Sequence, residues 1–110
     1  MIPQIKEGMK DITSQCNFIN CTFDGGRVLV DETSKIVYLS VMITPTVTNS
    51  WKTIIELPVS AKCLPVVESQ SGTGIIASEF WAYNLDDKVE VRGSITSGNQ
   101  IIIQGFYFKE

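Results

Sequence analysis

The chain has 110 residues, of which 44% are hydrophobic and 19% charged, and its formal net charge is −3 at pH 7. This length and composition indicate one globular domain with its own core, and they exclude a disordered chain. The nine basic residues are scattered. An acidic chain without a concentrated basic face is not suited to nucleic-acid binding.

No apolar run reaches the roughly 20 residues that a membrane span needs. Met1–Glu7 lacks the features of a signal peptide, so we expect no export by the secretory route. Histidine is absent, which removes the commonest general base and metal ligand. We therefore expect no metal and no cofactor. We interpret Cys16, Cys21 and Cys63 as buried, reduced thiols, and a Cys16–Cys21 bridge is the alternative.

The N-terminal part of the chain divides into a lead-in and a first strand. Residues 1–15 are polar and mixed, and we interpret them as a lead-in or linker before a single domain at residues 16–110. The first strand is predicted at Asn17–Phe23. A turn is predicted at Asp24–Gly26, because glycine adopts positive φ without steric cost.

The next elements are a hairpin and an isolated strand. Arg27–Val30 and Lys35–Thr44 are predicted as paired strands with a short polar connection. Trp51–Leu57 is the following strand, and Pro58 ends it because proline lacks a backbone donor. Side chains alternate between the faces of a strand, which predicts a core set consisting of Trp51, Thr53, Ile55 and Leu57.

The middle of the chain is less regular. Val59–Leu64 is predicted as an irregular link, and Pro65–Glu68 as a short strand. The small and polar residues of Ser69–Gly74 predict an exposed loop. Ile75–Tyr83 is predicted as a strand, and Asn84–Asp87 as the turn that follows it.

The C-terminal part predicts a second hairpin. Lys88–Ile95 alternates, with Glu90 and Arg92 expected at the surface, and a turn at Ser97–Asn99 leads into the last strand, Gln100–Phe108. That strand is apolar on both faces, so we expect the second sheet and a neighbouring chain to cover it. About eight strands without a helix predict an all-β, antiparallel β-sandwich of jelly-roll type.

Several landmarks follow one another in residues 27–110. They are the Trp51, Ile54, Leu57 and Pro58 pattern, then Pro65, the loop Gly72–Gly74, the turn Gly98–Asn99, and the aromatic ending Gly105–Phe108. Their order resembles that of the C-terminal head domains of bacteriophage tail fibres and baseplate receptor-binding proteins. The resemblance implies a jelly-roll head that assembles as a homotrimer and binds a saccharide of the bacterial cell surface.

The resemblance also implies a place and partners. The protein would be made in the cytoplasm of the bacterial host, would reside in the virion tail, and would contact other tail or baseplate proteins. It would not be an enzyme, and no nucleophile motif is present in the chain. The alternative is a structural assembly protein of a phage tail or baseplate, or another small oligomerising β-domain, without a ligand of its own.

The predicted saccharide contacts surround the aromatic end of one strand and the polar turn after it. Aromatic faces stack on the C–H faces of sugars, and neighbouring carboxylates and amides bond to hydroxyl groups. The set is Trp81, Tyr83, Asn84, Asp86 and Arg92. The alternative places both rings in the core or in a subunit interface.

Three further interpretations concern single residues or pairs. Trp51 could stack on a sugar, but its place in the alternating strand favours the core. Asp86 and Asp87 could bind calcium, although adjacent carboxylates are more often a solvated turn. Glu56 with Glu79 or Asp86 could form a glycosidase pair, which requires a defined separation between the carboxyl groups.

Overall fold

The computed structural model describes residues 9–63, 66–71, 74–76 and 80–110, and it gives only the backbone for residues 66–71 and 74–76. The strands are β1 (Met9–Asp11), β2 (Asn17–Phe18), β3 (Cys21–Asp31), β4 (Ile36–Pro45), β5 (Asn49–Leu57), β6 (Val66–Ser71), β7 (Gly74–Ile76), β8 (Phe80–Leu85), β9 (Lys88–Ile95) and β10 (Ile101–Phe108), and a short 3-10 helix, η1 (Thr13–Gln15), follows β1. One sheet has the order β1-β3-β4-β10-β6-β7 and the other has the order β2-β5-β9-β8. The predicted antiparallel β-sandwich is confirmed, with ten described strands rather than about eight.

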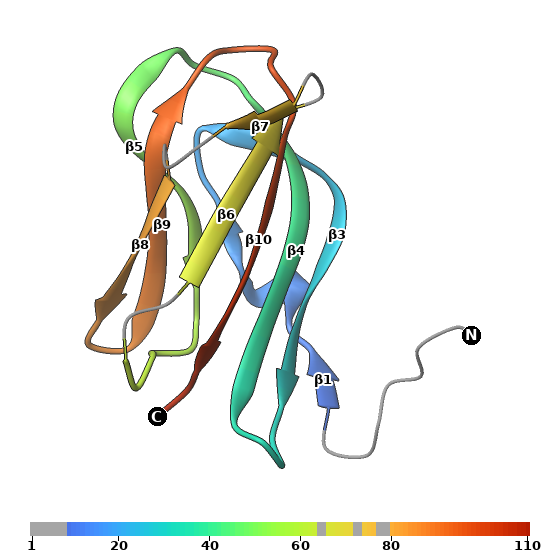
Figure 1. Cartoon of the computed structure of the whole chain (residues 1–110), viewed down its shortest axis with the longest axis vertical. Coiled ribbons are helices and arrows are strands. Elements are labelled where there is room, and N and C mark those ends of the chain that lie inside the picture. Colours follow the sequence, from blue (N-terminus) through green and yellow to red (C-terminus); the bar gives the residue numbers. More distant parts are fainter. Residues whose placement is uncertain (1–8, 64–65, 72–73, 77–79) are drawn as a thin grey trace.

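The connections between the sheets explain the jelly-roll-like form. β4 pairs with β10 in the six-stranded sheet, and their chain neighbours β5 and β9 pair in the four-stranded sheet. Next to them, β6 pairs with β10 and β8 pairs with β9. The chain is therefore an antiparallel ribbon rolled across both layers, as in a jelly roll. In Figure 1, β5, β8 and β9 lie together at the left, and β3, β4 and β10 run side by side to their right.

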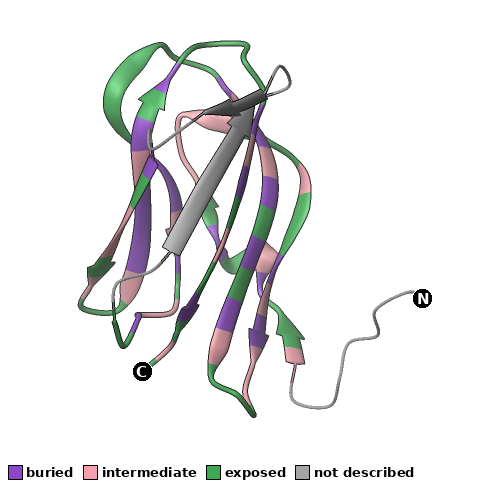
Figure 2. Ribbon diagram, viewed as in Figure 1, coloured by how far each residue is buried: buried purple, intermediate pink, exposed green. Residues whose placement is uncertain are grey.

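The core lies between the two sheets and follows from alternation within the strands. Val37, Leu39, Val41 and Ile43 of β4 are buried, and the residues between them are more exposed (Figure 2). In β9, Val89, Val91 and Ile95 are buried, as predicted. Each inward apolar side chain loses contact with water, which is the main stabilising term of a small sandwich.

The predicted hairpin of the N-terminal half is present, but its boundaries differ. β3 pairs with β4 as expected, whereas Gly25 and Gly26 lie inside β3 rather than in a turn. The register shifts between Phe23 and Gly25, and Gly26 has a φ of 106°. This stretch is therefore an irregularity within a long strand, and glycine at position 26 allows the positive φ that the irregularity requires.

The predicted first strand, Asn17–Phe23, is divided between the sheets. β2 pairs with β5 in the four-stranded sheet, and β3 begins at Cys21 in the six-stranded sheet. Asn20, between them, has a φ of 59°, in the left-handed region that Asn tolerates better than most residues. The chain changes direction at this residue and crosses from one layer to the other.

β5 departs from the predicted alternation. Its register against β9 shifts between Asn49 and Lys52 and again between Thr53 and Ile55. Ile54 and Ile55 are consequently both buried, and Trp51 is 49% exposed. The prediction that Trp51 and Thr53 belong to the core is wrong, because a residue inserted into a strand changes the face of every side chain before it.

Part of the predicted lead-in belongs to the sandwich. β1 pairs with β3, and Ile12 is buried in the core. Thr13 fixes this segment twice, since its hydroxyl accepts a hydrogen bond from the Val28 amide and donates one to Asp11. Residues 1–8 lie outside the described part of the chain.

The middle and the end of the chain also differ from the predicted boundaries. β6 and β7 occupy much of the predicted Ser69–Gly74 loop, and they pair with each other. The predicted strand Ile75–Tyr83 comprises parts of β7 and β8, and residues 77–79 lie outside the described residues.

The predicted hairpin of Lys88–Ile95 with Gln100–Phe108 is wrong. β9 pairs with β5 and β8, whereas β10 pairs with β4 and β6 in the other sheet, so the turn at Ser97–Asn99 connects the two layers instead of two paired strands. In β10, Ile101 and Ile103 are buried and Ile102 is half-buried on the outer face. Coverage of this face by a neighbouring chain stays a prediction.

Candidate functional site

The outer face of the four-stranded sheet brings together most of the predicted contact residues. Phe80 of β8 is buried, so alternation directs Trp81 and Tyr83 outward. The register between β8 and β9 places Trp81 opposite Arg92 and Tyr83 opposite Glu90. Directly opposite residues lie on the same face of a sheet. Three of the five predicted residues therefore share one surface.

The rings on this face form a connected aromatic group around Tyr83. The Trp51 ring meets the Tyr83 ring edge to face, with ring centroids 5.8 Å apart. The Arg92 guanidinium lies 5.2 Å from the centroid of the Tyr83 ring, within the range of a cation–π contact. Trp51 is 49% exposed and Trp81 is 55% exposed. We call the surface formed by Trp51, Trp81, Tyr83 and Arg92 the aromatic face.

Trp51 joins this surface through an unusual backbone conformation. Its φ is 60°, in the left-handed region that costs an ordinary residue roughly 1–2 kcal/mol. The adjacent register shift in β5 is the irregularity that accompanies this conformation. Alternation along the strand favoured the core for Trp51 over sugar stacking, whereas the structure places the ring at the surface beside Tyr83.

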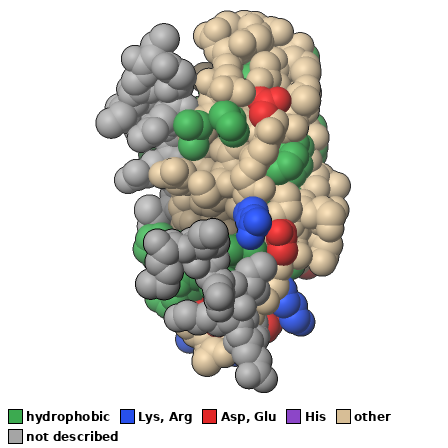
Figure 3. Space-filling model, turned by 90° about the vertical axis from the view of Figure 1, so that its right-hand side faces the viewer, with side chains coloured by type: hydrophobic (Ala, Val, Ile, Leu, Met, Phe, Trp, Pro, Cys, Tyr) green, Lys and Arg blue, Asp and Glu red, His purple; other side chains and the backbone are tan. Residues whose placement is uncertain are grey.

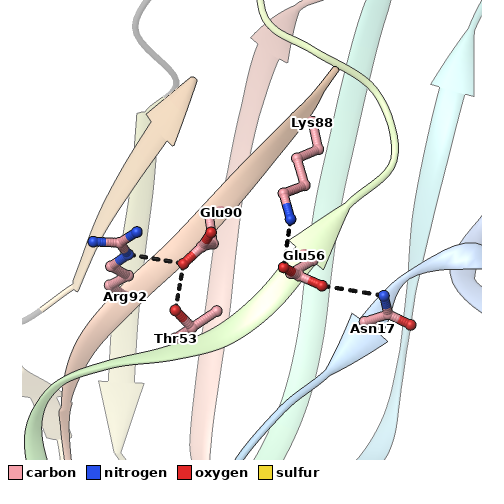
Figure 4. A network of polar contacts seen from close by, with 6 residues as sticks. All are labelled: Asn17, Thr53, Glu56, Lys88, Glu90 and Arg92. Carbon is pink, nitrogen blue, oxygen red and sulfur yellow. Dashed lines mark hydrogen bonds and ion pairs between the residues drawn. The ribbon is translucent and has the colours of Figure 1, made fainter. Parts of the chain in front are cut away.

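A polar network lies beside the aromatic face (Figure 4). Glu90 accepts hydrogen bonds from the Thr53 hydroxyl and from Nε of Arg92, the latter at 2.8 Å. Glu56, opposite Glu90 in the register, accepts one from Nζ of Lys88 at 2.6 Å and one from Nδ2 of Asn17 at 3.2 Å. Both carboxylates are thus paired on the outer surface of β5 and β9.

Glu90 differs from its predicted exposure. Only 7% of the residue is exposed, and its Oε1 accepts hydrogen bonds from two donors. The hydrogen bond from Thr53 and then that from Arg92 lower the pKa of Glu90, and this outweighs the opposing effect of burial. Glu90 therefore acts as a fixed anion that orients the Arg92 guanidinium against Tyr83.

The charges of the network bear on the glycosidase alternative. Hydrogen bonds from Lys88 and Asn17 lower the pKa of Glu56, as those from Thr53 and Arg92 lower that of Glu90. A glycosidase needs one carboxyl group whose pKa is raised, so that it can donate a proton. Glu56 and Glu90 both lack that property. Of the two partners considered for Glu56 from the sequence, Glu79 lies outside the described residues, and Asp86 lies in the exposed turn between β8 and β9.

Asn84 has a structural role rather than a place on the aromatic face. Its side-chain oxygen accepts a hydrogen bond from the Ala61 amide at 2.8 Å, and its Nδ2 donates to the Ala61 carbonyl oxygen. Ala61 is buried and also forms a bridge with Lys109. Asn84 therefore ties β8 to the link after β5, and the structure does not bring it together with Trp81 and Tyr83.

Asp86 lies in the turn between β8 and β9 and is exposed. Trp81 is near the other end of β8, so the strand separates the two residues. Among the described residues, no group of three or more His, Cys, Asp or Glu side chains is arranged to hold a metal ion. Asp86 and Asp87 gain no further ligand from that part of the chain.

The three cysteines differ from one another. Cys16 is buried and its thiol donates to the Ile12 carbonyl oxygen, whereas Cys21 is half-buried and Cys63 is exposed. Burial raises the pKa of the Cys16 and Cys21 thiols to about 11. The prediction of a buried thiol is confirmed for Cys16 and wrong for Cys63, and Cys16 and Cys21 form no disulfide. Low thiolate content excludes Cys16 and Cys21 as nucleophiles near neutral pH.

The comparisons with known proteins identify no relative. No protein-family model matches the chain, and no curated protein and no solved structure matches it significantly. In the part of the chain that the structure describes, no helix has the length and apolar character that a membrane span requires. The geometry of the aromatic face and the resemblance of the sequence landmarks are therefore the basis of the functional proposal.

Proposed function

We propose that the domain binds a saccharide of the bacterial cell surface on its aromatic face, and that it does not cleave the saccharide. The observation that carries this proposal is the exposure of Trp51 and Trp81 on the same sheet face as Tyr83 and Arg92. Large aromatic side chains usually bury most of their surface, so two tryptophans about half exposed on one face require an explanation.

The arrangement suits a sugar ring for two physical reasons. The C–H groups on one side of a pyranose form an apolar patch, and an exposed indole or phenol face can cover it. The ring hydroxyls need hydrogen-bond partners, and the Arg92 guanidinium, held in place by Glu90, offers donors beside the rings. Because Glu90 and Tyr83 already position Arg92, little side-chain freedom is lost when a ligand binds.

The proposed biological role is host attachment by a phage or prophage tail. The support is the order of sequence landmarks, which resembles that of tail-fibre and baseplate head domains, together with a sandwich of jelly-roll type. As part of the same proposal, the domain acts as a homotrimer within the virion tail and contacts other tail or baseplate proteins. The alternative is a structural assembly protein that binds no saccharide and uses the same aromatic side chains in a subunit interface. Saccharide binding and solution mass distinguish the two roles.

Tryptophan fluorescence offers a direct test of the aromatic face. The chain has only two tryptophans, Trp51 and Trp81, and both lie on this face. Purified bacterial capsule and cell-wall saccharides are titrated into the protein, and emission is followed for quenching and for a shift in wavelength. A saccharide that stacks on the face should change the emission in a saturable manner. Trp51→Phe and Trp81→Phe then assign the signal to one ring.

The matched variants are Trp81→Ala, Tyr83→Ala and Phe108→Ala. The first two remove rings from the aromatic face and should weaken binding about tenfold or more each, since stacking of one ring is worth roughly 1–3 kcal/mol. Phe108 is 44% exposed on the other sheet, so its removal takes away a similar ring and should leave binding unchanged. Equal loss in all three variants, or no binding by any saccharide, would contradict the proposal.

Solution mass tests the trimer separately. Light scattering on a sizing column should give three times the chain mass of 12.2 kDa. If Trp81→Ala or Tyr83→Ala instead lowered this mass, the aromatic face would be a subunit interface and the assembly alternative would be favoured. A monomer that still binds saccharide would remove the trimer and retain the binding surface.

A further inference from the structure

A second set of aromatic and polar side chains occupies the outer face of the six-stranded sheet. The register aligns residues of β3, β4 and β10 into two neighbouring rows on that face. The polar row consists of Arg27, Ser40 and Gln104. The apolar row consists of Leu29 and two aromatic residues, Tyr38 and Phe106. The rows are two residues apart along each strand, so they run across the sheet about 7 Å from each other.

The two rows line a hollow of about 470 Å³. Binding sites for small ligands usually have volumes of roughly 300–1,000 Å³. Tyr38 is 40% exposed and Phe106 is 44% exposed, so their rings are accessible at its rim. The hollow is therefore large enough for one sugar unit and has an apolar side and a polar side.

The polar row differs from the outer face of the four-stranded sheet in how its side chains are paired. Among the described residues, the side chains of Arg27, Ser40 and Gln104 have no hydrogen-bond or ion-pair partner, which contrasts with the paired groups of the other sheet. Asp11 lies close enough for the charge of Arg27 to contribute to its lowered pKa, but hydrogen bonds from Thr13 to Oδ1 are the larger cause. Within the part of the chain that the structure describes, the guanidinium, hydroxyl and amide therefore have no partner that competes with a ligand.

We propose that this hollow binds a saccharide unit that carries a carboxylate, such as a uronic acid. The Arg27 guanidinium pairs with the carboxylate, because its planar set of donors fits two carboxylate oxygens. Ser40 and Gln104 bond to ring hydroxyls, and the Tyr38 and Phe106 rings cover the apolar side of the sugar. The site lies on the opposite sheet from the aromatic face, so either can fail without the other.

A second copy of the chain suits this face less well. The pair Ser40 and Gln104 lies between two apolar pairs of the same face, Tyr38 with Phe106 and Met42 with Ile102, so the apolar surface is interrupted. Figure 3, seen from the right-hand side of Figure 1, shows described hydrophobic side chains in separate groups with acidic and basic side chains among them. Stable interfaces between copies have a more continuous apolar centre. Arg27, which forms no ion pair with another described residue, lies beside the hollow and instead offers charge complementarity to a small anion.

The test uses the whole chain labelled with nitrogen-15 and two matched probes. Tetragalacturonate carries carboxylates, and its fully methyl-esterified form is similar in size and uncharged. Amide shifts are recorded during titration with each probe. The expected result is a set of saturable shifts centred on Ser40, Gln104 and Phe106 with the acid, and at least about tenfold weaker binding with the ester.

Two variants and a control sharpen the assignment. Arg27→Gln and Phe106→Ala should each weaken binding of tetragalacturonate about tenfold or more, and the retained spectrum shows that the fold is intact. Lys10→Gln removes another exposed positive charge of the same sheet that does not line the hollow, and it should leave binding unchanged.

Several outcomes would overturn the proposal. They are absence of shifts up to millimolar ligand, equal affinity for the acid and the ester, and binding that Arg27→Gln does not change. Shifts confined to Trp81 and Tyr83 would also overturn it while supporting the aromatic face. If Phe106→Ala lowered the solution mass, the hollow would be part of a contact between copies, which would contradict a free ligand site.

Discussion

Gly26 in β3 and Trp51 in β5 occupy comparable irregular points of the two sheets. Both lie within a strand, both are close to a shift in register, and both have positive φ, 106° and 60°. At Gly26 a β-carbon would stand 2.1 Å from the Ser40 carbonyl oxygen, so packing against β4 requires glycine. At Trp51 the largest side chain occupies a strained conformation, and half of it remains in water.

The two residues differ in what requires their positive φ: at Gly26 it is close packing against β4, whereas at Trp51 no packing contact with the described residues requires it. The backbone of Gly26 is fixed by the neighbouring strand, and glycine adopts the conformation at little steric cost. Trp51 retains a conformation that costs roughly 1–2 kcal/mol without full burial of its ring. Strained residues that lack a packing reason concentrate at binding and active sites. The comparison therefore supports a binding role for Trp51 and predicts different results from substitutions at the two points.

The largest effect is expected at Gly26. Gly26→Ala forces a β-carbon into the Ser40 carbonyl and toward Cα of Val41, which are backbone atoms that cannot move without displacing β4. We expect a loss of about 3 kcal/mol or more in the free energy of unfolding, measured by urea denaturation. Gly25→Ala is the control, since nothing lies within 4 Å of the point that its β-carbon would occupy, and it should cost less than about 1 kcal/mol. Similar losses in both variants would show that close packing is not the cause.

The next largest effect is expected at Glu90, which holds the irregular part of β5 through the hydrogen bond from Thr53. Glu90→Gln removes a charge that accepts hydrogen bonds from Thr53 and Arg92, and it should cost about 1.5 kcal/mol at pH 7 after allowance for the partial exposure of Arg92. Because the folded pKa of Glu90 is lowered, its contribution is complete above the ordinary Glu pKa of about 4.5 and is lost as the pH falls through the folded pKa. Denaturation between pH 7 and pH 3 should show a shallower acid loss in Glu90→Gln.

The control for this pH dependence is Asp87→Asn in the exposed turn between β8 and β9. It removes a carboxylate for which the structure shows no hydrogen bond within the described residues, and it should leave the acid slope close to that of the native protein. A native slope in Glu90→Gln would mean that Glu90 does not stabilise the fold through its charge. The irregularity at Trp51 would then need another anchor.

Substitution of Gly98 measures the cost of a positive φ for a residue with a side chain, without a steric clash. Its φ is 86° in the turn before β10, and nothing lies within 4 Å of the position of a β-carbon. Gly98→Ala should therefore cost about 1 kcal/mol from backbone conformation alone. Thermal unfolding should place this variant between Gly25→Ala and Gly26→Ala. A loss as large as that of Gly26→Ala would show that conformation, rather than contact with β4, dominates at both glycines.

The fold could be predicted from the sequence where strands are regular. The apolar residues of Val37–Ile43 in β4 and of Val89–Ile95 in β9 alternate in the sequence, and they are buried as that pattern predicts. The predicted pairing agrees for β4 with β3, but not for β9 with β10, which lie in different sheets. Asp24–Gly26 predicted a turn, because the same conformational freedom serves a turn and a strand irregularity. Local sequence does not distinguish these uses, since the choice depends on how far β3 pairs with β4.

The candidate surface could be predicted only in part for the same reason. Trp81, Tyr83 and Arg92 follow from alternation in β8 and β9, two strands with an uninterrupted register between them. Trp51 was expected in the core because alternation was extended back from Leu57. One register shift lies between Thr53 and Ile55 and another between Asn49 and Lys52, and alternation cannot reveal either. Asn84 was expected to contact ligand, whereas its amide satisfies the buried backbone of Ala61, a partner 23 positions earlier in the chain.

The smallest effect on stability, and a large one on binding, is expected at Trp51. Trp51→Gly relieves the left-handed strain but loses the edge-to-face contact with Tyr83, which is worth about 0.5–1.5 kcal/mol. These terms nearly cancel, so unfolding should change by less than about 1 kcal/mol, whereas saccharide binding should fall about tenfold or more. Trp51→Asn, which retains tolerance of positive φ without the ring, should behave alike. If both variants lost stability as strongly as Gly26→Ala, the Trp51 ring would have a packing role, and the distinction between the two irregular points would not hold.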